Sequence, residues 1–248
     1  MPATDFNAID DDGLGCLQRE PINVEINAAV ERAIAAAARL PRVYLGASAV
    51  GYECLRQVQY DWWCTPELRA RVRLIFDRGH ALEALIRAQL LEAGFLFAPD
   101  SALAFAALDG HLQGHADGII TSGPAMPDVY FKFPCVWEAK CLNAKNFREV
   151  ARKGFSVTFP RYAVQVALYQ HFLNKPNPAL VSCVNANTCE VLHLELPFDV
   201  KRAQQSIDRV QAIVDATRRG ELLPRFTDDS SNFHCRICQH KKRCWGQT

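Results

Sequence analysis

The chain has 248 residues and a formal net charge of +1, with hydrophobic residues at 49% and charged residues at 22%. These ordinary globular values exclude wholesale disorder, and the length favours one domain with small appendages over a multidomain assembly. Residues 1–31 hold seven acids and one base, a net charge of −6, so residues 32–248 carry +7 and can face a polyanion.

The first six residues, Met-Pro-Ala-Thr-Asp-Phe, are not a basic segment followed by an apolar stretch. Charged residues also interrupt the most apolar windows, as Arg32 and Arg39 do on either side of Ala33–Ala38. We therefore expect a cytoplasmic protein with no membrane association. Ten cysteines in such a chain are expected to be reduced or metal-bound instead of paired in disulfides.

The first third of the chain is predicted to be helical. Three successive helical segments are expected. The first is rich in alanine, the second begins with a serine that can cap a helix, and the third begins with a Thr-Pro pair typical of a helix start. These segments are Asn23–Leu40, Ser48–Trp63 and Thr65–Gly94. Residues 1–22 show no periodicity and carry most of the acidic bias.

After Gly94 the pattern changes to short β-prone runs separated by turn residues, and helical periodicity then returns. Strands are expected at Phe95–Ala98, Ala102–Ala107, Leu112–Thr121, Tyr130–Cys141, Ala179–Asn185 and Glu190–Leu196. Helices are expected at Asn143–Arg152, Arg161–Asn174 and Asp199–Gly220. The turn-rich residues between the third and fourth strands predict a hairpin.

Strand alternation puts Glu138 and Lys140 on one face of the fourth expected strand. Alone, such a pair usually marks a solvated strand face. The preceding strand, however, contains Gly114-His115-Ala116-Asp117-Gly118, in which nearby glycines permit a bulge or the close approach of a ligand. Asp117 is thus a candidate site residue, with a simple turn aspartate as the alternative.

Two helices carry further polar candidates. His80 and Glu83 lie in the segment Gly79-His80-Ala81-Leu82-Glu83, where His80 is either a ligand or a histidine of the apolar core. Gln165 and Tyr169 are four residues apart and share one face of a later helix. The alternative for that pair is an interfacial tyrosine with an incidental glutamine.

Taken in order, the motifs Gly-His-x-x-Glu, Gly-x-x-Asp-Gly, Glu-x-Lys and Gln-x-x-x-Tyr resemble those of the RecB-like branch of the PD-(D/E)XK nuclease superfamily. The resemblance spans roughly residues 43–245 and implies an α/β fold with a restriction-endonuclease-like core, a mixed central sheet flanked by helices. The matching residues are His80, Glu83, Asp117, Glu138, Lys140, Gln165 and Tyr169. One departure is the long segment before Glu138, where Pro134 cannot donate to a central ladder, so that strand should begin after it.

The resemblance implies a metal-dependent DNA nuclease, most simply an exonuclease on single strands or DNA ends. Asp117, Glu138 and His80 would bind Mg²⁺ or Mn²⁺, because carboxylates suit both ions and an imidazole favours Mn²⁺. Lys140 would orient or help deprotonate the attacking water and offset developing negative charge. By resemblance, Gln165 and Tyr169 contact the substrate near the scissile phosphate.

Three cysteines, Cys235, Cys238 and Cys244, stand close together near the C-terminus in a basic segment. Three such thiols in a reducing compartment point to a metal site, which needs a fourth ligand. Cys54 stands where the iron–sulfur members of the RecB-like family, including the CRISPR-associated RecB-like exonucleases, place their N-terminal cysteine. The resemblance therefore implies a [4Fe-4S] cluster bound by these four cysteines.

The alternative is a structural Zn²⁺ held by the three late cysteines together with Cys54, His234 or His240. The remaining cysteines lie in apolar or strand contexts and are expected to be core thiols. They are Cys16, Cys64, Cys135, Cys141, Cys183 and Cys189.

The expected organisation is an acidic arm and helix over residues 1–42, a nuclease core over 43–227, and a cysteine-rich segment over 228–248 joined to Cys54. The sequence lacks a Gly-x4-Gly-Lys-Ser/Thr segment, so unwinding would have to come from a partner. Helicase, annealing and integrase proteins are the expected kinds of partner, and a homo-oligomer is left open. The competing hypotheses are an inactive metal-stapled DNA-binding module and a structural subunit of a repair, recombination or CRISPR adaptation complex.

Overall fold

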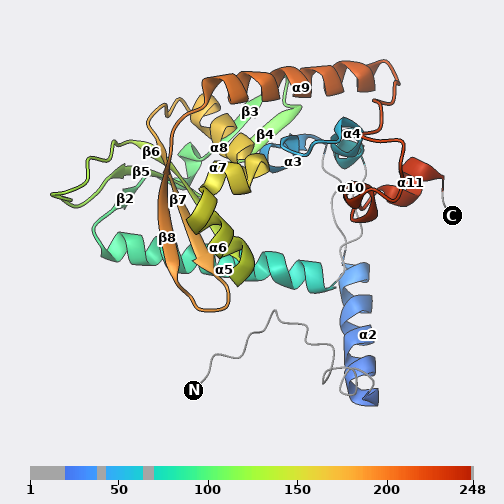
Figure 1. Ribbon diagram of the computed structural model, residues 1–248, viewed down its shortest axis with the longest axis horizontal. Coiled ribbons are helices and arrows are strands. Elements are labelled where there is room, and N and C mark those ends of the chain that lie inside the picture. The colour runs from blue at the N-terminus through green and yellow to red at the C-terminus, as the bar shows by residue number, and fades with distance from the viewer. Residues whose placement is uncertain (1–19, 38–42, 64–69, 247–248) are drawn as a thin grey trace.

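The structure, a computed structural model, describes residues 20–37, 43–63 and 70–246 (Figure 1). Its main sheet has five strands in the order β2-β5-β6-β7-β8, and a second sheet has the order β1-β4-β3. The strands are β1 Leu45–Gly46, β2 Leu96–Phe97, β3 Ala104–Ala107, β4 Leu112–His115, β5 Gly118–Ser122, β6 Cys135–Leu142, β7 Ala179–Asn185 and β8 Val191–Leu196. The central pair β6 and β7 is parallel, whereas the other neighbours in the main sheet are antiparallel.

The helices lie on both sides of the main sheet, as the sequence predicts for this α/β fold (Figure 1). They are α2 Pro21–Ala36, α3 Ala47–Val50, α4 Leu55–Trp63, α5 Ala70–Glu92, α6 Ala144–Lys153, α7 Phe155–Thr158, α8 Pro160–Phe172, α9 Val200–Arg218, α10 Phe233–Arg236 and α11 Lys241–Trp245, with a 3-10 turn at Asp100–Ala102. The longest, α5, ends just before Gly94, whose positive φ of 92° is typical of a glycine that stops a helix.

Alternation along β6 divides the core into two layers. Trp137 and Cys135 pack with Ile86 and Leu90 of α5 on one face of the sheet. Val136 and Leu142 point to the other face, where residues of α8 and α9 form the larger cluster. Glu138 and Lys140 share the second face, because side chains on a strand alternate with a period of two.

The sequence predicts one continuous helix over Ser48–Trp63, and this prediction is wrong, because the chain forms two separate helices there, α3 and α4. Gly51 ends α3, and a Cβ atom there would lie 2.5 Å from the backbone oxygen of Arg161 in α8. A continuous helix would carry side chains into this contact, so the close approach of α3 and α8 favours the break. The predicted start at Thr65 and Pro66 lies outside the described residues.

The expected strand Leu112–Thr121 is likewise divided, since β4 belongs to the small sheet and β5 to the main sheet. The residues between them are Ala116 and Asp117. The strand carrying Glu138 begins at Cys135, immediately after Pro134, which confirms the expected late start. The remaining predicted strands and helices agree with the structure to within a few residues, whereas the short helices α7, α10 and α11 lie where the sequence predicts none.

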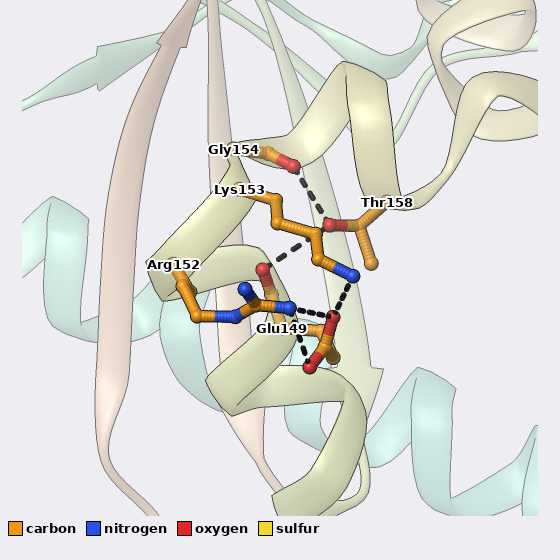
Figure 2. Close-up of polar contacts among 5 residues, drawn as sticks. All are labelled: Glu149, Arg152, Lys153, Gly154 and Thr158. Atoms are coloured by element: carbon orange, nitrogen blue, oxygen red, sulfur yellow. Dashed lines mark hydrogen bonds and ion pairs between the residues drawn. The ribbon is translucent and has the colours of Figure 1, made fainter.

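The turn between α6 and α7 directs the chain towards α8 and is held by polar contacts (Figure 2). Glu149 pairs with Arg152 and Lys153 on the surface of α6. The Thr158 hydroxyl donates to the backbone oxygen of Gly154 at 2.9 Å, and Gly154 itself has a φ of 84°. No helix in the described ranges is long and apolar enough to span a bilayer.

Two glycines should respond oppositely to alanine. A Cβ atom at Gly114 would lie 2.4 Å from Cε1 of Phe105 and 2.7 Å from Cε1 of Tyr169, whereas one at Gly79 in α5 would meet nothing within 4 Å. We expect Gly114→Ala to lower the free energy of unfolding by about 1–3 kcal/mol through overpacking. Gly79→Ala should raise it by about 0.5–1 kcal/mol through helix propensity. Urea unfolding measures both, and equal effects would contradict the packing described.

Candidate active site and cysteine pocket

The acidic centre of the molecule is Glu138, in the middle of β6. Its residue exposure is 0%, and the side chain of the neighbouring Lys140 is 17% exposed. The Lys140 ammonium group donates a hydrogen bond to Oε1 of Glu138. The structure therefore excludes a solvated strand face as the explanation for this pair.

Asp117 reaches the same place from the break between β4 and β5. Its Oδ2 atom accepts a hydrogen bond of 2.8 Å from the backbone N–H of Ala139, which lies between Glu138 and Lys140. Gly118 pairs with Trp137 in the ladder, so the break brings Asp117 beside the functional part of β6. Asp117 is thus a partner of that strand as well as a residue of a chain turn.

The charges of this site are mutually dependent. Burial, together with the Asp117 charge and against the opposing effect of Lys140, raises the pKa of Glu138 to about 8. Burial also raises the pKa of Asp117. For Lys140, burial acts to lower the pKa, but the charges of Glu138 and Asp117 outweigh it and keep the ammonium group protonated.

Helix α5 supplies Glu83 and His80 to the edge of this group. Burial, followed by the Asp117 charge, raises the pKa of the half-buried Glu83, and the His80 and Lys140 charges act in the opposite direction. His80 is exposed, so the core-histidine alternative is wrong. Its electrostatic effect on both Glu83 and Asp117 places it near the carboxylates.

The donor set suits a hard divalent cation. Oε2 of Glu138 is buried and has no hydrogen-bond partner among the described residues. A buried carboxylate oxygen in that state calls for a proton or a cation. Three carboxyl groups and one imidazole provide the ligand types that Mg²⁺ and Mn²⁺ accept.

Helix α8 closes the site with Gln165 and Tyr169. Both are buried, and the Gln165 amide donates to the Tyr169 hydroxyl at 3.0 Å, so the two side chains share one face of α8 as the sequence predicts. Oε1 of Gln165 is buried without a partner in the described part of the chain. Burial and the Glu138 charge raise the pKa of Tyr169, which keeps its hydroxyl neutral beside the acids.

Sequence reasoning missed two residues at the start of α8. The Lys140 ammonium nitrogen lies 4.9 Å from the ring centre of Tyr162, and Arg161 donates to the Tyr162 hydroxyl at 2.8 Å. Tyr162 is one helical turn before Gln165, and that spacing was the only signal available in the sequence.

The second site is a pocket between α4 and the C-terminal helices α10 and α11. The four predicted cysteines, Cys54, Cys235, Cys238 and Cys244, all line it. Burial raises the pKa of Cys238, and the nearby Cys54 and Cys244 contribute in the same direction. Tertiary structure thus brings one early and three late thiols into one pocket.

Polar contacts attach this pocket to α4. Nε2 of His240 lies 2.6 Å from Oδ1 of Asp61, and the Gln239 amide donates to the same oxygen at 2.7 Å. Arg225 donates to the backbone oxygen of Cys244 at 2.7 Å. The Asp61 contact occupies one ring nitrogen of His240, which would leave only Nδ1 for a zinc ion.

Neither set of side chains is arranged as a finished ligand sphere. Over residues 20–37, 43–63 and 70–246, no group of three or more His, Cys, Asp or Glu side chains is positioned to hold a metal ion.

Of the cysteines expected in the core, Cys135 and Cys183 are buried and Cys141 is half-buried. The prediction of a core thiol is wrong for Cys189, because this residue is exposed between β7 and β8, with a φ of 63°. Cys16 and Cys64 lie outside the described residues.

Comparison with known proteins identifies related folds only. No protein-family profile matches the chain, and no curated protein matches it significantly. An alkaline exonuclease from Laribacter hongkongensis superposes with a TM-score of 0.53 at 14% identity, covering 78% of this chain and 93% of the exonuclease. Its complex with dAMP gives a TM-score of 0.52 with the same identity and coverage. A protein designated SSO0001 gives a TM-score of 0.46 at 13% identity, covering 92% of this chain and 97% of that one.

The chain therefore has a mixed α/β fold similar to that of a nuclease, with mixed sheets flanked by helices. At 14% identity the likeness concerns the fold, and activity has to be argued from the site. The iron–sulfur branch and the CRISPR association of the sequence resemblance stay predictions.

Proposed function

We propose that this chain is a metal-dependent nuclease that hydrolyses phosphodiester bonds in DNA. The observation that carries the proposal is the convergence of Asp117, Glu138 and Lys140 at one buried place on a nuclease-like fold. Two carboxyl groups and an ammonium group at one place are the components that such hydrolysis requires. The exonuclease neighbour, solved with dAMP, supports DNA as the substrate class.

Asp117, Glu138 and His80 would hold Mg²⁺ or Mn²⁺, with Glu83 beside them. The ions would supply an activated water, charge stabilisation on the phosphoryl group and help for the leaving oxygen. Lys140 stays protonated against Glu138 and presents a positive charge that offsets negative charge at the phosphate. Gln165 and Tyr169, whose side chains are hydrogen-bonded to each other, would position the substrate, with the Tyr169 hydroxyl kept neutral.

We further propose that Cys54, Cys235, Cys238 and Cys244 bind a [4Fe-4S] cluster, with structural Zn²⁺ as the alternative. Their shared pocket supports this assignment. The cluster would join residues 228–246 to α4, so that an early and a late part of the chain stabilise one another. An exonuclease acting on single strands or ends, with a helicase, annealing or integrase partner, is the form of the activity that the motifs favour.

Removing a carboxylate or the ammonium group should abolish cleavage. We expect Asp117→Asn, Glu138→Gln and Lys140→Ala each to reduce kcat on labelled single-stranded DNA by about 100-fold or more, with folded protein retained. Glu195→Gln, at an exposed position on β8, is the matched control and should cleave normally. Wild-type protein that binds DNA but never cuts it with Mg²⁺ or Mn²⁺ would favour an inactive binding module or structural subunit instead.

Divalent-ion binding should tighten as the pH rises. Burial raises the pKa of Glu138 to about 8, so below that pH the carboxyl group is protonated and must release its proton to accept an ion. Calorimetry with Mn²⁺ in two buffers of different ionisation enthalpy should show proton release near pH 7 that disappears above about pH 9. Glu138→Gln should remove most of that release, and a pH-independent affinity in wild-type protein would contradict the assignment.

The purified protein should be brown, absorb broadly near ~400 nm and contain about four iron and four sulfide ions per chain. Cys54→Ser should bleach it as fully as Cys235→Ser, because both thiols line the pocket. Cys189→Ser is the control, since that thiol is exposed in a distant turn. Colourless protein with stoichiometric zinc would establish the zinc alternative, and a brown Cys54→Ser protein would remove Cys54 from the ligand set.

A further inference from the structure

Arg161, at the start of α8, lies between two tyrosine rings. Its guanidinium carbon is 4.4 Å from the ring centre of Tyr52 and 4.6 Å from that of Tyr162. It also donates to the Tyr162 hydroxyl at 2.8 Å. The two rings therefore fix the plane of the guanidinium group, which stacks on aromatic faces more readily than an ammonium group does.

The surrounding backbone holds this arrangement in place. Gly51 approaches the Arg161 backbone so closely that a Cβ atom would lie 2.5 Å from the carbonyl oxygen. Arg209 of α9 donates a hydrogen bond to the backbone oxygen of Tyr52. Arg161 is thus positioned by three segments, α3 with its following turn, α8 and α9.

Among the described residues, no Asp or Glu forms an ion pair with the Arg161 guanidinium group, whereas Arg73, Arg152 and Arg219 each pair with a carboxylate. Arg161 is only half-exposed, so solvent does not surround it freely. A guanidinium group has five N–H donors in a planar fork, and a phosphate is the anion whose geometry matches that fork.

Lys140 of the candidate active site lies near the same tyrosine ring, that of Tyr162. The Lys140 ammonium nitrogen lies 4.9 Å from the Tyr162 ring centre, and the Arg161 guanidinium carbon lies 4.6 Å from it. The two cations are thus separated by no more than the sum of these distances. A strand with one phosphate at Lys140 would bring an adjacent phosphate into this neighbourhood.

We propose that Arg161, held by Tyr52 and Tyr162, binds the DNA phosphate next to the scissile one and so sets the register of the strand. This inference rests on the proposed nuclease function, because it assigns Lys140 to the scissile phosphate. Arg161 acts on the substrate through a charge-assisted hydrogen bond and takes no part in bond breaking. Its contribution is therefore to binding more than to the chemical step.

The test measures binding of a fluorescent single-stranded oligonucleotide in EDTA, where no cleavage occurs, at salt concentrations from about 50 to 200 mM. Arg161→Gln should weaken binding roughly tenfold and reduce the slope of log Kd against log salt by about 0.7, the value for one phosphate contact on a single strand. Arg161→Lys should keep the slope and lose part of the affinity. Arg152→Gln is the matched control, because Arg152 pairs with Glu149 on the surface of α6 (Figure 2).

A purely structural Arg161 would lower the melting temperature in Arg161→Gln while leaving the salt slope at the wild-type value, and that result would overturn the inference. Cleavage assays with Mn²⁺ separate this outcome from failure of the nuclease proposal. If wild-type protein cleaves, Arg161→Gln should raise KM about tenfold with little change in kcat. If wild-type protein never cleaves, the nuclease proposal fails, and a slope change confined to Arg161→Gln would still support a phosphate contact at this residue.

Discussion

The buried carboxyl group of Glu138 is the constraint on which the candidate active site depends. A carboxylate at 0% exposure is unfavourable unless its charge is compensated, and Lys140 provides that compensation only in part because Asp117 opposes it. The arrangement persists because β6 is paired on both edges and packed on both faces. Trp137 anchors one face against α5, and its indole N–H donates to Ser182 of β7 at 2.9 Å. The apolar core thus stabilises a polar cluster that would be unfavourable by itself.

Several further components are brought to β6 by local irregularities of the chain. Asp117 lies in the break between two sheets, where its side chain accepts the Ala139 N–H. Gly114 leaves room for Tyr169, which then contacts Gln165. Gly51 allows α3 to pack closely on the first turn of α8. These positions would be defects in regular strands and helices, and here they let polar side chains approach β6.

The cysteine pocket is supported independently of any ion. Besides the Asp61 contacts with His240 and Gln239, the fully buried Gln59 of α4 donates to the backbone oxygen of Glu221 at 2.7 Å and accepts from the Leu223 N–H at 2.9 Å. These bonds attach the segment after α9 to α4, which follows the turn containing Tyr52. The pocket and the proposed phosphate contact at Arg161 therefore share one structural support.

The sequence by itself determined the α/β order, the late start of the Glu138 strand and the candidate acids, because periodicity, proline chemistry and motif spacing are local properties. It also identified the four cysteines, although only folding placed Cys54 in one pocket with residues 180 or more positions away. The division of two expected elements, the exposure of His80 and Cys189, and the stacking of Arg161 on Tyr52 were decided by tertiary structure. Each depends on which distant backbone or ring occupies the neighbouring space, and a linear pattern of residue types does not specify that packing.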